Sequence, residues 1–301
     1  MRIFITGAGG FLGRNLIDRL LKTECFKIYA ISSQKSVLKK RYKDKVLYTT
    51  LEDIIDYKLS LNKEDILINC AFPRQSNGEE FAKGLEYVAK LLFIFTQRGV
   101  GSVINISSQS VYSQYRTSPA IEDITSVDLQ TMYAVGKYSS ELFTSILCSN
   151  LNYTNVRMAS LIGPGFDQRV TNKLIDSALK SKKIIIQTGQ EKFGFLDIID
   201  AVDGLFQLIL TPSYKWKKIY NLGNNNSYSL LNIAQTIADV FKNELNQDIE
   251  IEVIKSDSLL NSSIDSTSFF KDTGYKPITT LQESIRLILM NKLDTVAREG
   301  E

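Results

Sequence analysis

The chain contains no histidine among its 301 residues. Histidine is the commonest metal ligand in proteins and the usual base that activates a serine or cysteine nucleophile. Its absence excludes histidine-based metal sites and Ser-His or Cys-His nucleophiles, and we expect no metal site. Acid–base chemistry near neutral pH must therefore come from carboxylates, lysine, tyrosine or cysteine.

Cysteine is also scarce. Cys25, Cys70 and Cys148 are far apart and form no CxxC pair, which predicts free thiols in a reducing compartment, the cytoplasm. The first residues form no signal-peptide pattern, and no stretch is long and apolar enough to cross a bilayer. The net charge is only +3, with scattered basic residues. We therefore expect neither a nucleic-acid nor a membrane partner.

Short apolar runs alternate with amphipathic segments in the first half of the chain. The apolar runs, which predict strands, are 2–6, 27–31, 45–48, 65–71, 102–107 and 154–158. The longest amphipathic segments, which predict helices, are 11–22, 79–98 and 127–150. Apolar strands separated by helices indicate parallel strands covered on both faces. The pattern predicts an α/β fold with a Rossmann-like, doubly wound parallel sheet.

The regular alternation of apolar and amphipathic segments changes after residue 162, and no segment resembles a flexible linker. We expect a smaller α/β lobe interleaved with the sheet domain. The sheet domain is assigned 1–162 with 198–223, and the lobe 163–197 with 224–293. Residues 294–301 have no apolar period and are predicted to fray.

Gly7 and Gly10 lie between the first predicted strand and the first predicted helix, which Phe11 and Leu12 open and which contains Gly13. Glycines in this context permit a tight turn, close approach of a pyrophosphate, and close packing of helix on strand. The helix N-terminus then offers free N–H groups to the phosphates. We expect these five residues to bind a dinucleotide. The alternative is a purely structural turn.

The end of the second predicted strand distinguishes NAD from NADP, because an acid there binds the ribose hydroxyls of NAD. This chain has Ser32, Ser33 and Lys35 in that region and no carboxylate. Hydroxyls and a lysine suit a 2′-phosphate, so we expect NADP in slight preference to NAD. An ordinary surface turn in an NAD enzyme is the alternative.

Tyr133 and Lys137 lie four residues apart, and therefore on one face of a predicted helix. A nearby cation favours the phenolate and makes a tyrosine usable as a base. Ser108 leaves the end of the fifth predicted strand, where open α/β sheets bind ligands. We expect these three residues to be catalytic, and Tyr133 and Lys137 also to contact the cofactor. Taken singly, an exposed helical pair and a polar strand end explain them equally well.

Together these motifs resemble the extended short-chain dehydrogenase/reductase superfamily, in particular its NAD-dependent epimerase/dehydratase family. The matching segments, in chain order, are the glycine motif, 69–71, 107–112, Tyr133 with Lys137, 156–165, 197–201 and 220–223. The resemblance implies that Ala71 and Arg74 contact the cofactor. It also implies hydride transfer at a sugar carbon, usually carbon 4 of a nucleotide sugar, with Tyr133 moving the proton.

Two departures from the family pattern narrow this expectation. The Asp-Glu pair of the 4,6-dehydratases is replaced by Gln109 and Ser110, which disfavours dehydration. A 4-ketoreductase is favoured and a 4-epimerase is the alternative. Phe193 occupies the place of the arginine that usually holds the substrate diphosphate, so the substrate has other cationic contacts or lacks a diphosphate.

The substrate contacts expected from the resemblance are Gln109, Ser110, Ser160, Arg169, Asn172, Lys173 and Lys192. Family members often dimerise through a four-helix bundle, which implies a homodimer built from 79–98 and 127–150. Core packing of these helices is the alternative. A non-catalytic dinucleotide-binding regulatory module is the competing hypothesis of another class, and the intact Ser108, Tyr133 and Lys137 count against it.

Overall fold

A computed structural model describes residues 1–73, 77–122 and 127–299. At its centre is a seven-stranded sheet in the order β10-β6-β5-β4-β1-β2-β3, and every neighbouring pair is parallel. The strands are β1 (Arg2–Thr6), β2 (Lys27–Ile31), β3 (Leu47–Tyr48), β4 (Ile66–Asn69), β5 (Ser102–Ser108), β6 (Asn152–Met158) and β10 (Ile219–Leu222). The predicted Rossmann-like, doubly wound α/β fold is confirmed.

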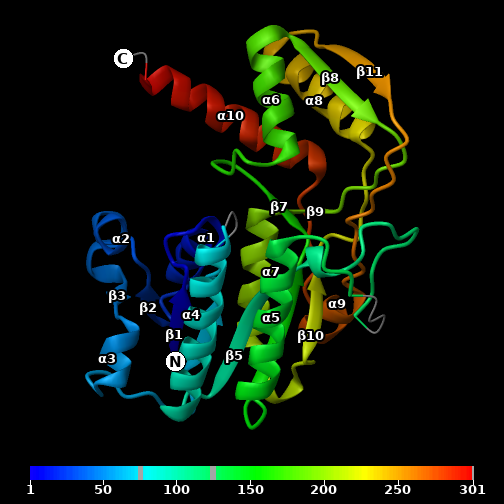
Figure 1. Cartoon of the computed structure of the whole chain (residues 1–301). Helices are drawn as coiled ribbons and strands as arrows, with labels where there is room; N and C mark the ends of the chain where they lie inside the picture. Colours follow the sequence, from blue (N-terminus) through cyan, green and yellow to red (C-terminus); the bar gives the residue numbers. More distant parts are fainter. Residues whose placement is uncertain (74–76, 123–126, 300–301) are drawn as a thin grey trace.

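Helices cover both faces of the sheet (Figure 1). The first face packs against α1 (Phe11–Leu21), α2 (Lys35–Tyr42), α7 (Ile198–Leu210) and α9 (Thr267–Thr273). The second packs against α3 (Leu51–Ile55), α4 (Gly78–Gln97) and α5 (Met132–Leu147). Because both faces are buried, the strands are apolar along almost their whole length, as Ile3, Phe4 and Ile5 of β1 illustrate.

A smaller lobe lies over the C-terminal edge of the sheet (Figure 1). It contains α6 (Val170–Ser181), β8 (Lys183–Thr188), α8 (Leu230–Leu245), β11 (Glu250–Lys255) and α10 (Leu281–Glu299), with β8 and β11 paired in parallel. Beneath it, β7 (Ser160–Ile162) pairs with β9 (Phe195–Asp197). The smaller lobe is thus formed by α6 and β8, which precede α7 in the chain, and by α8, β11 and α10, which follow β10. The domain limits at 162, 197 and 223 stay predictions.

Two predicted helix limits were wrong. The helix predicted over 127–150 begins only at Met132, because Thr131 caps it by accepting a hydrogen bond from the Ala134 N–H at 3.1 Å. Val127 instead forms an isolated bridge with Tyr112. At the other end of the chain, α10 continues to Glu299, so the stretch from Asp294 to that residue is helical where fraying was predicted.

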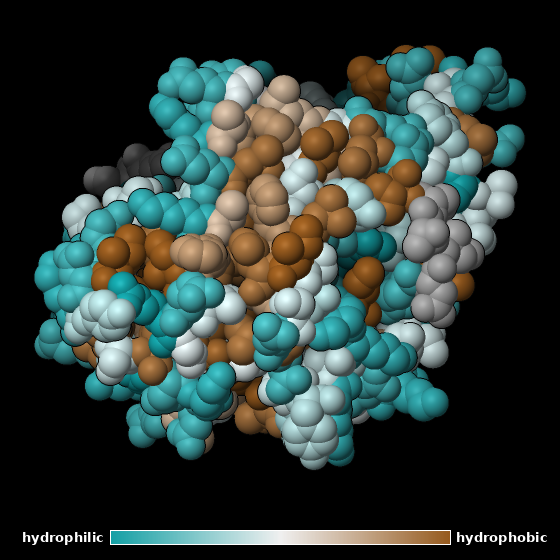
Figure 2. Space-filling model, turned by 60° about the horizontal axis from the view of Figure 1, so that its bottom comes forward, coloured by the Kyte–Doolittle hydropathy of each residue, from teal (hydrophilic) through white to brown (hydrophobic). Residues whose placement is uncertain are grey.

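One side of the sheet domain exposes apolar side chains. Figure 2 shows a band of hydrophobic residues on the side where α4 and α5 lie in Figure 1. Phe93 on α4 is 53% exposed, and Leu142 and Ile146 on α5 are 45% and 69% exposed. None of the described helices is both long and apolar enough to span a membrane.

Candidate active site

The turn between β1 and α1 is shaped by its glycines. Gly7 has φ of +64°, and a side chain on Gly13 would place its Cβ 2.4 Å from the Gly7 carbonyl oxygen. Gly10 precedes α1 without any side-chain cap, and the first turn carries no acid. The N–H groups that begin the helix are therefore available to a phosphate, so this turn fits a dinucleotide.

A groove leads from this turn across the ends of β2 and β4. It is lined by two serines of the β2 end, Ser32 and Ser33, together with Gly7 and Ala71. Lys35 lies elsewhere, in a separate hollow with Lys39 and Lys43. The structure therefore brings the predicted serines to the groove but not the predicted lysine. Arg74 lies outside the described residues.

A pocket of about 250 Å³ continues from the glycine turn. It is lined by all three predicted catalytic residues, Ser108, Tyr133 and Lys137, and by Gly7, Gly10, Phe11, Leu12 and Gly13. Residues from β5, α5 and the glycine turn, which are distant in sequence, thus share one pocket. This arrangement places a phenol, a hydroxyl and an ammonium beside the expected cofactor site.

Lys137 is held firmly in this pocket. Its side chain is buried, and its Nζ donates to the Ile106 carbonyl oxygen at 2.7 Å. The same Nζ lies 5.9 Å from the centroid of the Tyr133 ring. In the same pocket, the Ser108 hydroxyl accepts a hydrogen bond from the Ser110 hydroxyl at 2.9 Å. Lys137 therefore ties the end of β5, which carries Ser108, to the helix that carries Tyr133.

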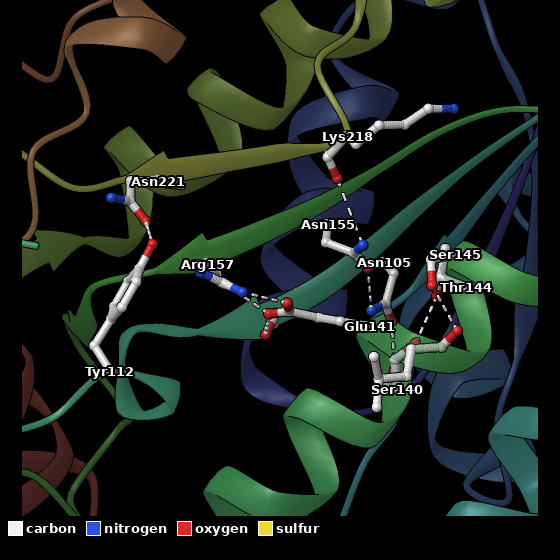
Figure 3. A network of polar contacts seen from close by, with 12 residues as sticks. Asn105, Tyr112, Ser140, Glu141, Thr144, Ser145, Asn155, Arg157, Lys218 and Asn221 are labelled. Atoms are coloured by element: carbon white, nitrogen blue, oxygen red, sulfur yellow. Dashed lines mark hydrogen bonds and ion pairs between the residues drawn. The ribbon is translucent and has the colours of Figure 1, made fainter. Parts of the chain in front are cut away.

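A buried ion pair ties the same helix to β6, the strand that pairs with β5 (Figure 3). Glu141, one helical turn beyond Lys137, accepts hydrogen bonds from the Arg157 Nε at 2.9 Å and from its terminal nitrogen at 2.6 Å. The Ser107 hydroxyl also donates to Glu141. Burial alone would lower the pKa of Arg157, but the hydrogen bonds and charge of Glu141 outweigh it and raise that pKa. The guanidinium thus stays charged inside the protein.

An amide ladder fixes the strand ends relative to one another. Thr6, Asn69, Asn105 and Asn155 stand in register on β1, β4, β5 and β6. The Thr6 hydroxyl donates to Asn69 at 2.7 Å, Asn69 to Asn105 at 2.9 Å, and Asn105 to Asn155 at 2.8 Å. Ser140 of α5 donates to the Asn105 oxygen at 2.8 Å, as Figure 3 also shows. These bonds fix the register of β1, β4, β5 and β6, including the strand that ends at Ser108.

The predicted substrate residues are divided among several places. Arg169 lines the triad pocket at the start of α6, whereas Lys192 lines a different hollow in the smaller lobe. Lys173 is exposed on α6, and Ser160 is half-buried on β7. Asn172 is completely buried, and neither its amide nitrogen nor its amide oxygen has a hydrogen-bond partner among the described residues.

Gln109 and Ser110 follow the catalytic serine directly. Gln109 is buried, and its side-chain oxygen accepts from the Gln114 amide at 3.3 Å, while Ser110 bonds to Ser108. Both side chains thus support the loop after β5. Neither is an acid or a base, in agreement with the argument against dehydration.

Several lining residues escaped the sequence analysis. The apolar wall of the triad pocket is formed by Cys70, Phe72, Ile106, Met158, Ala159, Leu161 and Phe166. Phe166 stacks on Phe11 with ring centroids 4.4 Å apart. Burial raises the pKa of the Cys70 thiol to about 12, although the Lys137 ammonium acts to lower it. Among these residues, Cys70 lies within the 69–71 motif and Phe72 directly follows it, so the motif signalled both positions.

The fold and the glycine turn define a dinucleotide-binding enzyme architecture. A family model described as the NAD dependent epimerase/dehydratase family matches residues 3–223. The chain belongs to this family of enzymes. The resemblance stated from the motifs is thereby confirmed.

Individual relatives are distant. The bifunctional polymyxin resistance protein ArnA of Wigglesworthia glossinidia brevipalpis is 27% identical over 79% of this chain, which spans only 41% of that protein. UDP-glucuronic acid decarboxylase 5 of Arabidopsis thaliana is 23% identical over 96% of this chain and 88% of its own. Among solved structures, a mutant UDP-glucuronic acid 4-epimerase from Bacillus cereus, in complex with UDP-4-deoxy-4-fluoro-glucuronic acid and NAD, has a TM-score of 0.81 at 19% identity, covering 98% of this chain and 100% of that one. At that identity the likeness concerns the fold alone.

Proposed function

We propose that the protein is an NAD(P)-dependent oxidoreductase that transfers a hydride at carbon 4 of a nucleotide sugar. The observation that carries the proposal is the shared pocket of Ser108, Tyr133 and Lys137, walled by the glycine turn. The names of the relatives support the substrate class, since those proteins act on or bind UDP sugars. Membership of an enzyme family favours this function over a non-catalytic regulatory module.

The dinucleotide, when bound, accepts or supplies the hydride. Tyr133 takes the proton of the sugar hydroxyl during oxidation and returns it to the carbonyl oxygen during reduction. Ser108 donates a hydrogen bond to the reacting oxygen. Lys137 holds its ammonium 5.9 Å from the centroid of the Tyr133 ring, and its bond to the Ile106 carbonyl keeps that charge in place.

We favour reduction of a 4-keto sugar over 4-epimerisation. Gln109 and Ser110 supply no second acid–base pair, so only chemistry that needs the triad alone remains. The two reactions differ in their cofactor balance. A reductase oxidises one equivalent of NAD(P)H for each sugar reduced, whereas an epimerase leaves the cofactor unchanged overall. Product analysis alongside cofactor absorbance therefore distinguishes them.

For the cofactor, we propose that NADP(H) binds in preference to NAD(H), in a family that is described as NAD-dependent. Ser32 and Ser33 line the groove at the end of β2 and no acid of that strand end does so. Two cations of α4, Lys83 and Lys90, line the same groove, and so do the acids Glu52 and Glu86. Calorimetric titration with each cofactor tests this choice, and tighter binding of NAD would overturn it.

The catalytic proposal is tested by Tyr133→Phe, with the exposed loop residue Tyr115→Phe as the matched control. We expect Tyr133→Phe to lower kcat at least about 100-fold, because that is the usual contribution of a positioned acid–base group. Binding of NAD(P) should change little, and Tyr115→Phe should retain activity. Tyr133→Phe activity within tenfold of the parent would refute the assigned role.

We also propose that the protein is a homodimer whose interface buries the apolar band on α4 and α5. We place the protein in the cytoplasm, where free thiols persist. The structure describes all three cysteines as free. Light scattering of Ile146→Glu, from the centre of this band, should give a monomer. Ile278→Glu, at a residue that is 86% exposed elsewhere, should stay dimeric. A monomeric parent at micromolar concentration would exclude the dimer.

A further inference from the structure

The hollow that contains Lys35 lies at the outer edge of the sheet domain and measures about 390 Å³. It is lined by three lysines, Lys35, Lys39 and Lys43, and by Asp44 and Tyr48. β3, which carries Tyr48, is the last strand of the sheet, and Figure 1 shows α2 beside it. The volume falls within the range of about 300–1,000 Å³ that small-molecule sites occupy. The hollow is therefore large enough for a small ligand.

The three lysines of this hollow follow one another at intervals of four residues, so they are neighbours along one face of α2 and its end. Lys35 stands in the first turn of α2, where the helix dipole disfavours a cation and no acid is present. Arg41 of the same helix pairs with Asp18 at 2.7 Å. The three lysines, in contrast, form no ion pair with any residue that the structure describes. Their mutual repulsion favours an incoming anion.

The Tyr48 hydroxyl is a second and independent sign of a ligand. Its oxygen is buried and has no hydrogen-bond partner within the described chain, although the residue lines the hollow. The Lys39 Nζ lies 6.0 Å from the centroid of the Tyr48 ring. Burial and the negative charge of Asp44 raise the pKa of Tyr48, so the hydroxyl keeps its proton near neutral pH. An unpaired hydroxyl near an ammonium offers a proton that an anionic oxygen can accept.

Lys43 is held in a backbone conformation that favours glycine. Its φ is +50° and its ψ is −126°. A side chain is strained there, and strained residues of this kind cluster at ligand-binding and active sites. The chain thus keeps a cation where glycine would fit without strain. Asp44, which follows, is the one acid among the lining residues, so three positive charges face one negative charge.

We propose that this hollow binds a small phosphoryl anion, with Lys39 and Lys43 as charged contacts and the Tyr48 hydroxyl as a further donor. Several donors and a net positive charge match the oxygens of a phosphoryl group. The hollow shares no lining residue with the dinucleotide groove or with the triad pocket. The anion is therefore neither the cofactor nor the sugar substrate. Gln34 and Thr49, which neighbour the hollow in sequence, do line the groove, so the test is made with the cofactor present.

The experiment titrates inorganic pyrophosphate into the full chain by calorimetry, after saturation with NADPH and, separately, with NADH. We expect the parent to bind pyrophosphate in both cases. Lys39→Gln and Tyr48→Phe should each weaken this binding about tenfold or more, the effect of one charged hydrogen bond. The matched control is Lys40→Gln, which removes the same charge from the same helix outside the hollow and should leave the affinity nearly unchanged. Lys43→Gly should also weaken binding without lowering the midpoint of thermal unfolding, because it relieves the backbone.

Three outcomes would overturn the proposal. The first is a parent that binds no pyrophosphate at about millimolar concentration, or that binds it no better than Lys39→Gln and Tyr48→Phe do. The second is an equal loss in Lys39→Gln and Lys40→Gln with Tyr48→Phe unchanged, which indicates general attraction to a basic surface. The third is binding in the presence of NADH but not of NADPH, which assigns the hollow to the cofactor's 2′-phosphate. None of these results bears on the catalytic proposal, because that is measured by hydride transfer in Tyr133→Phe.

Discussion

The Glu141–Arg157 pair permits a quantitative test of how β6, the strand beside the one that carries Ser108, is held to α5. The two side chains are 5% and 3% exposed, and two hydrogen bonds of 2.9 and 2.6 Å join them. Replacing Arg157 with Met keeps an apolar stem of similar length but removes both donors. The Glu141 carboxylate then keeps only the Ser107 hydroxyl as a side-chain donor among the bonds described. The buried Glu141 carboxylate has then lost most of the hydrogen bonds that, in the folded protein, replace its contacts with water.

The expected cost follows from that geometry. Opposite charges about 4 Å apart attract by about 4 kcal/mol at the effective dielectric of a protein. Breaking a buried pair from one side typically destabilises a protein by about 3–5 kcal/mol. We therefore expect Arg157→Met to lower the free energy of unfolding by that amount. Glu141→Leu alone should cost a similar amount, because it strands the guanidinium.

The double variant distinguishes a stranded charge from lost packing. Together, Arg157→Met and Glu141→Leu remove both charges, so the loss should be well below the sum of the single losses. Urea unfolding of the four proteins, followed by fluorescence, gives the coupling energy. A single Arg157→Met variant that loses less than about 1 kcal/mol, or losses that simply add, would show that the pair does not hold β6 to α5 as argued.

Three further predictions concern single residues. Burial raises the pKa of Cys70 to about 12. Iodoacetamide should therefore label Cys70 slowly near pH 9, where a free thiol has ionised, and the exposed Cys25 should react first. Because this thiol ionises at lower pH in the unfolded chain, the free energy of unfolding should fall as the pH rises above about 8.5. Fast labelling of Cys70 near neutral pH would contradict the assignment. Asp200→Ala should lower the free energy of unfolding by about 3 kcal/mol in urea titrations, since the buried carboxylate accepts three hydrogen bonds from 275–279; an unchanged midpoint would count against this. Gly13→Ala should abolish calorimetric binding of NAD(P), because its Cβ would lie 2.4 Å from a carbonyl oxygen of the turn, and normal affinity would refute the packing argument.

The local motifs predicted the fold and much of the triad pocket. Gly7, Gly10 and Gly13 are read directly from the sequence because strand, turn and helix follow one another within a few residues. Tyr133 and Lys137 are similarly constrained by helical spacing. In each case the geometry depends on neighbours in the chain. Short-range spacing was therefore enough to predict these contacts.

Contacts across the sheet were not predictable in this way. Nothing near Asn105 in the sequence indicates that it will stand between Asn69 and Asn155, because that depends on strand order and register. Lys35 was assigned to the cofactor by its place after β2, yet α2 directs it into another hollow. Nothing near Arg157 in the sequence indicates that it will pair with Glu141 of α5, because that contact depends on how the helix packs on the sheet. Long-range packing decides all three cases.

Most buried polar side chains of the sheet domain discussed above have their hydrogen bonds completed by other residues. Asn69, Asn105 and the Glu141–Arg157 pair are examples. Unpaired buried groups occur among the described residues of both parts of the fold: the Thr154 hydroxyl on β6 and the side-chain amide of Asn172 on α6 have no partner. An unpaired group of this kind costs about 1–3 kcal/mol. The completed bonds join neighbouring strands to one another and to α5, so they form the frame that holds Ser108 and Tyr133 in one pocket.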